Sequence, residues 1–120
     1  MTLENKGAEE LIRFLFEIKK RTLLLLSEKS YTQLHCITLG FIFGYNNAVN
    51  DSVAEHLDKV RKNNTWTNFR NYFGAKYNVP LSDVRKMVEY FGGEEEAFYA
   101  FFEGLENFLK ENNIGVPEIE

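Results

Sequence analysis

Residues 94–112 read EEEAFYAFFEGLENFLKEN and carry the most regular helical pattern of the chain. At 100° per residue the large apolar side chains share one half of the helix cylinder, as expected for an amphipathic helix packed on a core. They are Phe98, Phe101, Phe102, Leu105, Phe108 and Leu109. The other half carries Glu96, Tyr99, Glu103 and Glu106. We therefore predict a helix over this stretch with one buried face and one face in water.

Further helices are predicted upstream, because apolar residues recur at helical spacing and two-residue alternation is nearly absent. They run from about Ala8 to Arg21, Ser30 to Ala48, Ser52 to Asn63, Thr65 to Tyr77 and Ser82 to Phe91. The segment Thr22–Lys29 either continues the first helix or forms a connection. Residues 113–120 are predicted to be a frayed tail. The fold class predicted is all-α, a compact bundle of five to six helices around an aromatic-rich core.

Length and composition indicate one globular domain over residues 1–120. A chain of 120 residues with 44% apolar side chains, including 11 Phe and 6 Tyr, can bury a core without disulfides or metals. Its one cysteine excludes an intramolecular disulfide, which is compatible with a reducing compartment. No secretory signal and no apolar run of membrane-spanning length is visible. The sequence therefore predicts a cytoplasmic protein that does not insert into a membrane.

The predicted second helix, from Ser30 to Ala48, is apolar on nearly every side, which is typical of a central, buried helix. Ser30 is the expected N-cap residue. On this reading Cys36 is a small buried hydrophobe and His35 is a core histidine with its hydrogen bonds satisfied. Gly40 and Gly44 lie four residues apart on one face, where we expect close approach of another backbone or of an aromatic ring.

The chain carries no recognisable catalytic motif. It has no HExxH, no CxxC, no glycine-rich phosphate loop and no GxSxG. Its two histidines, His35 and His56, would need further ligands from elsewhere to hold a metal. Neither a catalytic site, a metal nor a cofactor is predicted, and the chain is expected not to be an enzyme.

The charge distribution is uneven, although the formal net charge is only −4. From Glu89 onward there are nine acidic residues and one basic residue, Lys110. Between Lys59 and Lys86 there are seven basic residues and one acid, Asp83. The acidic helix face has two interpretations, an ordinary solvated face or a docking surface for a basic partner. The basic stretch does not favour nucleic-acid binding, because its charges are dispersed and the isoelectric point is about 5.3.

The order of several short motifs resembles a group of small helical bacterial proteins. The motifs are Gly44-Tyr45, Trp66-x-x-Phe69, Phe73-x-x-x-Tyr77, Gly93-Glu94-Glu95-Glu96-Ala97-Phe98, Phe101-Phe102-x-x-Leu105 and Phe108-Leu109. Over about residues 20–110 this pattern is similar to immunity proteins of contact-dependent inhibition and other polymorphic toxin systems. The chain departs from the group after the first helix. There it reads Arg21-Thr22-Leu23-Leu24-Leu25-Leu26 instead of Arg-Pro followed by Met-Tyr-Leu-Gly.

The resemblance implies a protein that binds a cognate toxin and covers its active site or a nearby surface. A nuclease toxin is the expected partner, since its phosphate-binding site is basic and an acidic face would mimic phosphates. From helix geometry, the predicted partner-binding residues are Glu89, Glu94, Glu95, Glu96, Tyr99, Glu103 and Glu106. Tyr99 is the expected anchor, because aromatic residues contribute most at interfaces. The alternatives are a regulatory or adaptor domain that binds another protein, and a nucleic-acid binder that uses residues 59–86.

Overall fold

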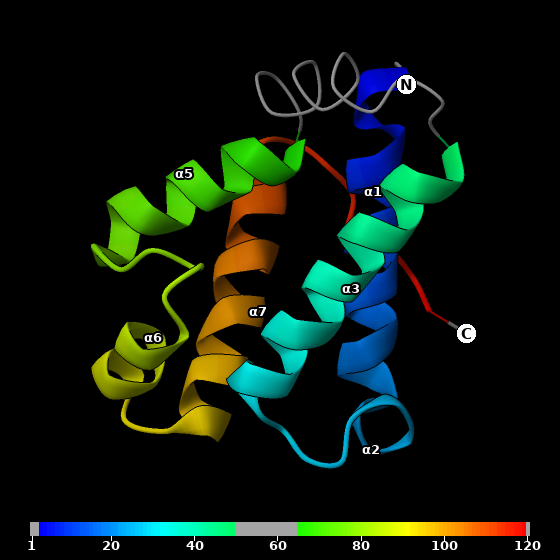
Figure 1. Cartoon of the computed structure of the whole chain (residues 1–120). Coiled ribbons are helices and arrows are strands. Elements are labelled where there is room, and N and C mark those ends of the chain that lie inside the picture. Colours follow the sequence, from blue (N-terminus) through cyan, green and yellow to red (C-terminus); the bar gives the residue numbers. More distant parts are fainter. Residues whose placement is uncertain (1–2, 50–64, 120) are drawn as a thin grey trace.

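A computed structural model describes the backbone of residues 3–49 and 65–119 and the side chains of residues 9–44 and 65–119. Within these residues the chain forms six helices and no strand (Figure 1). The helices are α1 (Leu3–Lys20), α2 (Thr22–Leu25), α3 (Tyr31–Val49), α5 (Thr65–Tyr77), α6 (Val84–Phe91) and α7 (Glu94–Glu111). The prediction of an all-α bundle is thus confirmed. The predicted helix from Ser52 to Asn63, which includes His56, lies outside the described residues.

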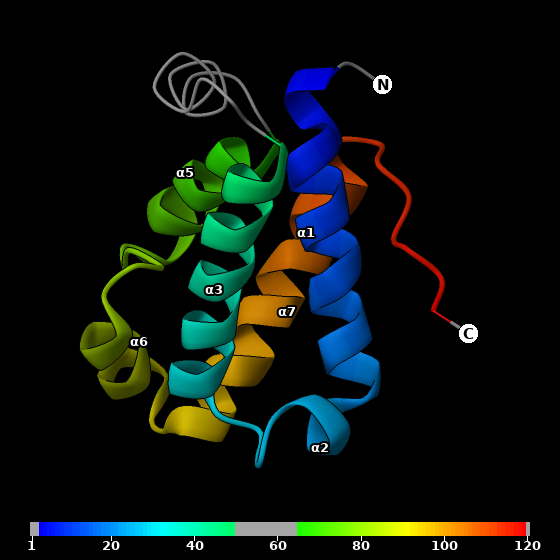
Figure 2. The same ribbon diagram turned by 45° about the vertical axis from the view of Figure 1, so that its right-hand side comes forward.

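Helix α7 is one of the central helices of the bundle. It packs against α3, α5 and α6, and α1 packs against α3 and α5. Figure 2 shows α7 behind the pair formed by α1 and α3, with α5 and α6 beside it. Every apolar residue predicted for the inner face of α7 is buried, as are Ala97 and Gly104. The 3.6-residue periodicity of this segment therefore predicted its buried face correctly.

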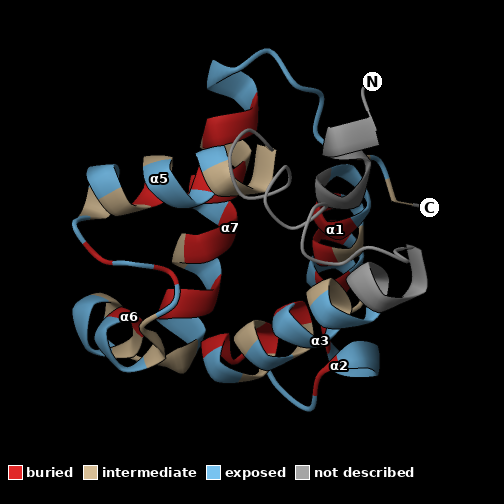
Figure 3. Ribbon diagram, turned by 45° about the horizontal axis from the view of Figure 1, so that its top comes forward, coloured by how far each residue is buried: buried red, intermediate tan, exposed pale blue. Residues whose placement is uncertain are grey.

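Aromatic side chains from α5 and α7 form the centre of the core. Phe69 and Phe73 are fully buried, and the Phe69 ring meets Phe101 edge-on at a centroid distance of 5.6 Å. Figure 3 shows the buried residues of α1, α3 and α7 on their facing sides. Burial of each phenylalanine stabilises the fold by about 1.5–3 kcal/mol, and an edge-to-face pair adds about 1 kcal/mol.

Gly104 permits the close approach of α5 to α7. A Cβ atom at this position would lie 2.8 Å from two ring carbons of Phe73, nearer than such atoms come in folded proteins. Because the Phe73 ring is itself packed on all sides, it has little room to move away. The absence of a side chain at Gly104 therefore sets the spacing of the two helices.

The first predicted helix ends where expected but begins earlier, because α1 starts at Leu3. Arg21 leaves the helical region with φ −118° and ψ 44°, and a separate helical turn, α2, follows. The Thr22 hydroxyl donates to the Ile18 carbonyl at 2.9 Å, which satisfies a carbonyl at the end of α1. The ambiguous segment Thr22–Lys29 therefore does not continue the first helix.

Ser30 is the N-cap of α3, as predicted, because its hydroxyl accepts a hydrogen bond from the Gln33 backbone N–H at 3.2 Å. The prediction that α3 is a central, buried helix is wrong for one of its sides. Cys36 is exposed, and Phe43 is 66% exposed. A Cβ atom at Gly40 would meet nothing within 4 Å, so this glycine does not mark a close approach. An apolar residue in this helix is therefore not by itself evidence of a buried position.

The connection from α6 to α7 depends on two glycines. The N-cap of α6 is Asp83, one residue after the predicted helix start at Ser82, since its carboxylate accepts a hydrogen bond from the Lys86 N–H at 3.1 Å. At the other end Gly92 and Gly93 have φ values of 90° and 153°, which favour glycine. This turn reverses the chain so that α6 packs against α7.

The described residues after α7, up to Ile119, form no helix. In the predicted tail, residues 113–120, the described part runs to Ile119, whose side chain packs against the core. The Lys20 ammonium group donates to the Ile119 carbonyl oxygen, which places this segment alongside the end of α1 (Figure 2). Among the described helices, none has the length and apolar content needed to cross a bilayer.

Candidate functional site

The seven predicted binding residues lie on α6 and α7, but the structure divides them into two groups. Some carboxylates are bonded to other parts of the fold, while others have no hydrogen bond or ion pair within the described residues. The bonded carboxylates are Glu89, Glu94 and Glu106. The free carboxylates are Glu95, Glu96 and Glu103. This division decides which of the acidic residues can bind a partner without losing an internal contact.

Glu94 is a cap for another helix. Its carboxylate accepts the Thr32 backbone N–H at 2.8 Å, the Thr32 hydroxyl at 2.6 Å and the Ser30 hydroxyl at 3.0 Å. Partial burial opposes ionisation, but the hydrogen bonds from Thr32 and Ser30 outweigh it and hold the Glu94 pKa below its ordinary value. Glu94 therefore joins α7 to the N-terminus of α3 and is structurally engaged.

Two other predicted carboxylates form ion pairs. Glu106 is bonded to Lys19 of α1, with both side chains about one-third exposed. Glu89 accepts from Arg85 at 3.1 Å, one helical turn away on α6 and well exposed. Exposed pairs of this kind add little to stability. Each pair does place a positive charge beside a carboxylate, so the surface is less negative than the number of acidic residues suggests.

The outer face of α7 carries three carboxylates that are free within the described residues, and one exposed aromatic ring. Tyr99 is 46% exposed, and its hydroxyl accepts a hydrogen bond from Lys29 in the loop after α2. That bond is the main cause of a raised Lys29 pKa. Glu95 and Glu103 are exposed on either side of Tyr99 in the sequence, and the Glu96 carboxylate folds back over Gly93. Within the described residues, Glu95, Glu96 and Glu103 are the carboxylates of the predicted site that are exposed and carry no internal bond.

A leucine ridge, which we define as Leu23, Leu24 and Leu25 of α2, adjoins this face and was not identified from the sequence. The three side chains are 75%, 81% and 41% exposed. Lys19 before α2 is bonded to Glu106, and Lys29 after it is bonded to Tyr99, so both flanks of α2 are tied to α7. Adjacent exposed leucines are a feature of protein-binding surfaces. The sequence feature that could have identified the ridge is the apolar run 23–26. This run contains no polar residue, so any side of it that faces the solvent must expose leucine.

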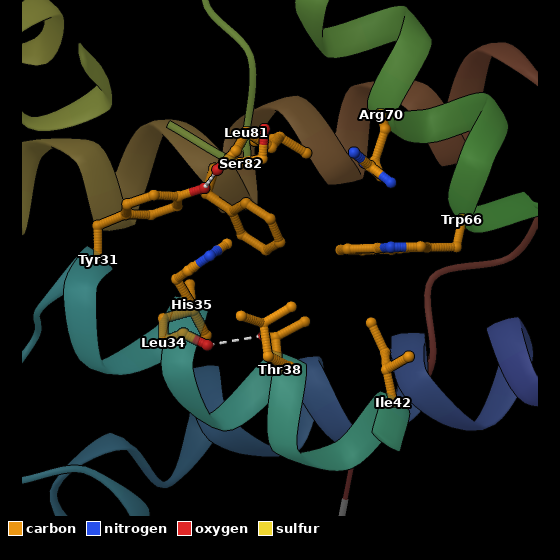
Figure 4. Close-up of a pocket in the computed structure, with 11 residues that line it drawn as sticks. Tyr31, Leu34, His35, Thr38, Ile42, Trp66, Arg70, Leu81 and Ser82 are labelled. Carbon is orange, nitrogen blue, oxygen red and sulfur yellow. Dashed lines mark hydrogen bonds between the residues drawn. The ribbon is translucent and has the colours of Figure 1, made fainter. Parts of the chain in front are cut away.

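A second feature is a pocket between α3, α5 and the loop 79–82 (Figure 4). Its volume is about 110 Å³, and it opens beside a shallower hollow of about 370 Å³. Arg70, Leu81 and Ser82 line both spaces. The walls of the smaller space are mainly apolar and include Trp66 and Phe101. The pocket thus combines an apolar floor with a polar, basic rim.

His35 lines this pocket. The prediction that it is a core histidine with satisfied hydrogen bonds is wrong for two reasons. No hydrogen bond of its imidazole is present among the described residues, and the side chain is only half-buried. Burial and, second, the positive charge of Arg70 lower the His35 pKa. Burial also raises the Tyr31 pKa, and the Tyr31 hydroxyl donates to the Leu81 carbonyl at 2.5 Å. Arg70 therefore faces two groups that are not anions.

Comparisons with known proteins give no family assignment. No protein-family model, no curated protein and no solved structure shows significant similarity to this chain. In the part of the chain that the structure describes, no group of three or more His, Cys, Asp or Glu side chains is arranged to hold a metal ion. The chemistry of the two surfaces above is therefore the basis for the functional argument.

Proposed function

We propose that this chain is a binding protein that neutralises a cognate bacterial toxin by covering a basic surface of it. The observation that carries the proposal is the exposed leucine ridge of α2, whose flanking residues Lys19 and Lys29 are bonded to α7. Exposed apolar side chains next to free carboxylates and a half-exposed tyrosine match the anatomy of an interface, in which an apolar centre is bordered by charged groups.

The roles of the surface residues follow from their chemistry. Leu23 and Leu24 would bury their side chains in an apolar depression of the toxin, which supplies affinity. Tyr99 would add a rigid aromatic contact at the centre. Glu95 and Glu103 would pair with Lys or Arg residues around a nuclease active site and accelerate association. This surface differs from the predicted residue set in two ways. It includes the leucine ridge, and it excludes Glu94, which caps α3.

The identity of the partner as a toxin rests on the motif resemblance given above. The surface supports a protein partner of basic character, and a nuclease domain is the toxin class that meets this description, since it must hold phosphate groups. No residue of the chain needs to perform chemistry in this mechanism.

The test is calorimetric titration of the chain with the product of an adjacent toxin-type gene, at about 50 mM and 300 mM salt. We expect a 1:1 complex that weakens at the higher salt concentration, since ions screen exposed charges. Leu24→Ser should weaken binding by about 30-fold, the effect of losing an interface hot spot. Glu95→Lys with Glu103→Lys should weaken it by about tenfold or more.

Glu9→Lys on α1 is the matched control, because Glu9 is also an exposed glutamate but lies on another helix. It should leave the affinity within about twofold of the native value. Absence of a complex at micromolar concentrations would reject the toxin-binding proposal for that pair. If the complex forms and neither the leucine nor the glutamate substitutions weaken it, the toxin-binding proposal stands but the assigned binding surface is wrong.

A further inference from the structure

The pocket between α3 and α5 contains polar groups that the fold itself does not use. Two of its polar side chains are already bonded internally, since Tyr31 donates to the Leu81 carbonyl and Thr38 donates to the Leu34 carbonyl at 2.7 Å. Arg70 and His35, in contrast, make no hydrogen bond or ion pair among the described residues. Figure 4 shows them on α5 and α3, facing the same space.

Arg70 gives the pocket an uncompensated positive charge. Among the described residues no carboxylate lines either hollow, whereas the electrostatic effect of Arg70 reaches both Tyr31 and His35. A guanidinium group presents two parallel N–H donors that match the planar geometry of a carboxylate. The exposed Ser82 hydroxyl lies on the same rim. The polar side of the pocket is therefore suited to one small planar anion.

The rest of the pocket surface is apolar and of limited size. Its surface is formed by Leu34, Ile42, Trp66 and Phe101. The volume of about 110 Å³ is somewhat smaller than the ~150 Å³ of an apolar cavity that holds benzene. A branched aliphatic group fits this space better than a large ring. A phosphate or sulfate ion would use Arg70 but would leave the apolar surface uncovered.

We propose that this pocket binds a carboxylate carried on a short branched apolar group, with the carboxylate on Arg70 and the apolar group against Trp66 and Phe101. The same chemistry occurs in a free branched-chain acid and in the C-terminal leucine of a peptide. The site is separate from the leucine ridge and the outer face of α7. It is therefore independent of the proposed toxin-binding function.

The experiment is an NMR titration of the ¹⁵N-labelled chain with 4-methylpentanoate, its amide and inorganic phosphate. We expect saturable shifts of the Trp66 indole N–H and of backbone amides around His35 with the acid. The amide should bind about tenfold or more weakly, because it loses the charge-assisted hydrogen bonds to Arg70. Phosphate should give no saturable shift at Trp66.

Arg70→Gln should weaken binding of the acid about as much as amidation does, and Arg70→Lys should restore part of it. Arg13→Gln is the matched control, because Arg13 is an exposed arginine on α1. Equal affinity for the acid and the amide, or full binding by Arg70→Gln, would overturn the proposal. Absence of saturable shifts with every carboxylate would overturn it as well.

A second pair of ligands identifies the source of the carboxylate. Acetyl-Gly-Leu with a free carboxyl group is compared with the same peptide ending in an amide. Tighter binding of the peptide acid than of 4-methylpentanoate would support the site and assign it to a peptide C-terminus. Tighter binding of the free acid would support the site and assign it to a small metabolite-sized carboxylate.

Discussion

The Glu94 carboxylate caps α3 through Thr32, which lies on a different helix and 62 positions earlier in the chain. One carboxylate oxygen accepts the Thr32 backbone N–H and the other accepts its hydroxyl. Orphan N–H groups at the first turn of α3 are thereby satisfied by the first residue of α7. The same carboxylate lies at the positive end of the α7 dipole. The pair fixes where two of the central helices meet.

Glu94→Gln should therefore destabilise the fold by about 0.5–2 kcal/mol, the range found when a helix cap is lost. The Glu94 pKa is lowered in the folded state from an ordinary value of 4.5. Its contribution to stability is thus fully present above that value and is lost as the pH falls through the lower folded pKa. Urea unfolding of the native chain and the variant should show the difference at pH 7 and a smaller difference below about pH 4.

Glu95→Gln is the control for this prediction, because Glu95 is the adjacent residue and has no hydrogen bond or ion pair within the described residues. Its effect should stay within about 0.5 kcal/mol. If Glu94→Gln and Glu95→Gln have the same stability at pH 7, the capping role assigned to Glu94 is wrong.

The contrast between α7 and α3 shows what sequence periodicity can and cannot predict. In α7 apolar residues such as Phe101 and Leu105 recur at helical spacing, and charged residues lie between them. The pattern itself therefore identifies the buried face. In α3 apolar residues lie on nearly every side of the helix, and nothing local distinguishes buried Leu34 from exposed Phe43. Exposure there depends on which helices pack against α3, and this is a tertiary property.

The candidate sites could be predicted only in part for the same reason. Exposure of Tyr99 and Glu103 follows from the helical phase of α7. The internal partner of Glu94 is far away in sequence, and no local pattern reveals that this acid is already engaged. The pocket is formed by His35 and Arg70, which are 35 positions apart and meet only when α3 and α5 pack. Sequence patterns indicate helix faces, but not contacts between distant segments.

Gly104→Ala should destabilise the fold by about 1–3 kcal/mol, because a Cβ atom there would overlap the Phe73 ring and force the core apart. Helix propensity acts in the opposite direction, since alanine favours helix over glycine by about 1 kcal/mol. Gly40→Ala in α3 isolates that effect, because an added Cβ meets nothing within 4 Å. Thermal unfolding should show a lower Tm for Gly104→Ala and an equal or higher Tm for Gly40→Ala. A raised Tm in both variants would contradict the tight packing at Gly104.

Leu24→Ser should leave the stability of the isolated chain nearly unchanged, within about 0.5 kcal/mol, because the Leu24 side chain is 81% exposed. Leu26→Ser, two residues later, should cost about 2–5 kcal/mol, because Leu26 is buried in the core. Chemical denaturation of both variants measures the difference. A large loss for Leu24→Ser would mean that the leucine ridge is covered in the folded chain, and it would remove the basis for an apolar docking surface.

Cys36 should react with a thiol reagent in the folded protein. It lies on the exposed side of α3, contrary to the expectation of a buried position. Because reaction requires only access and the thiolate form, Ellman's reagent should titrate one thiol per chain without denaturant. The rate should lie within about tenfold of the rate in denaturant, since no unfolding step is needed. Cys36→Ser, as control, should show no reaction and an unchanged Tm. A thiol that reacts only after unfolding would place Cys36 in the core and reverse the assigned orientation of α3.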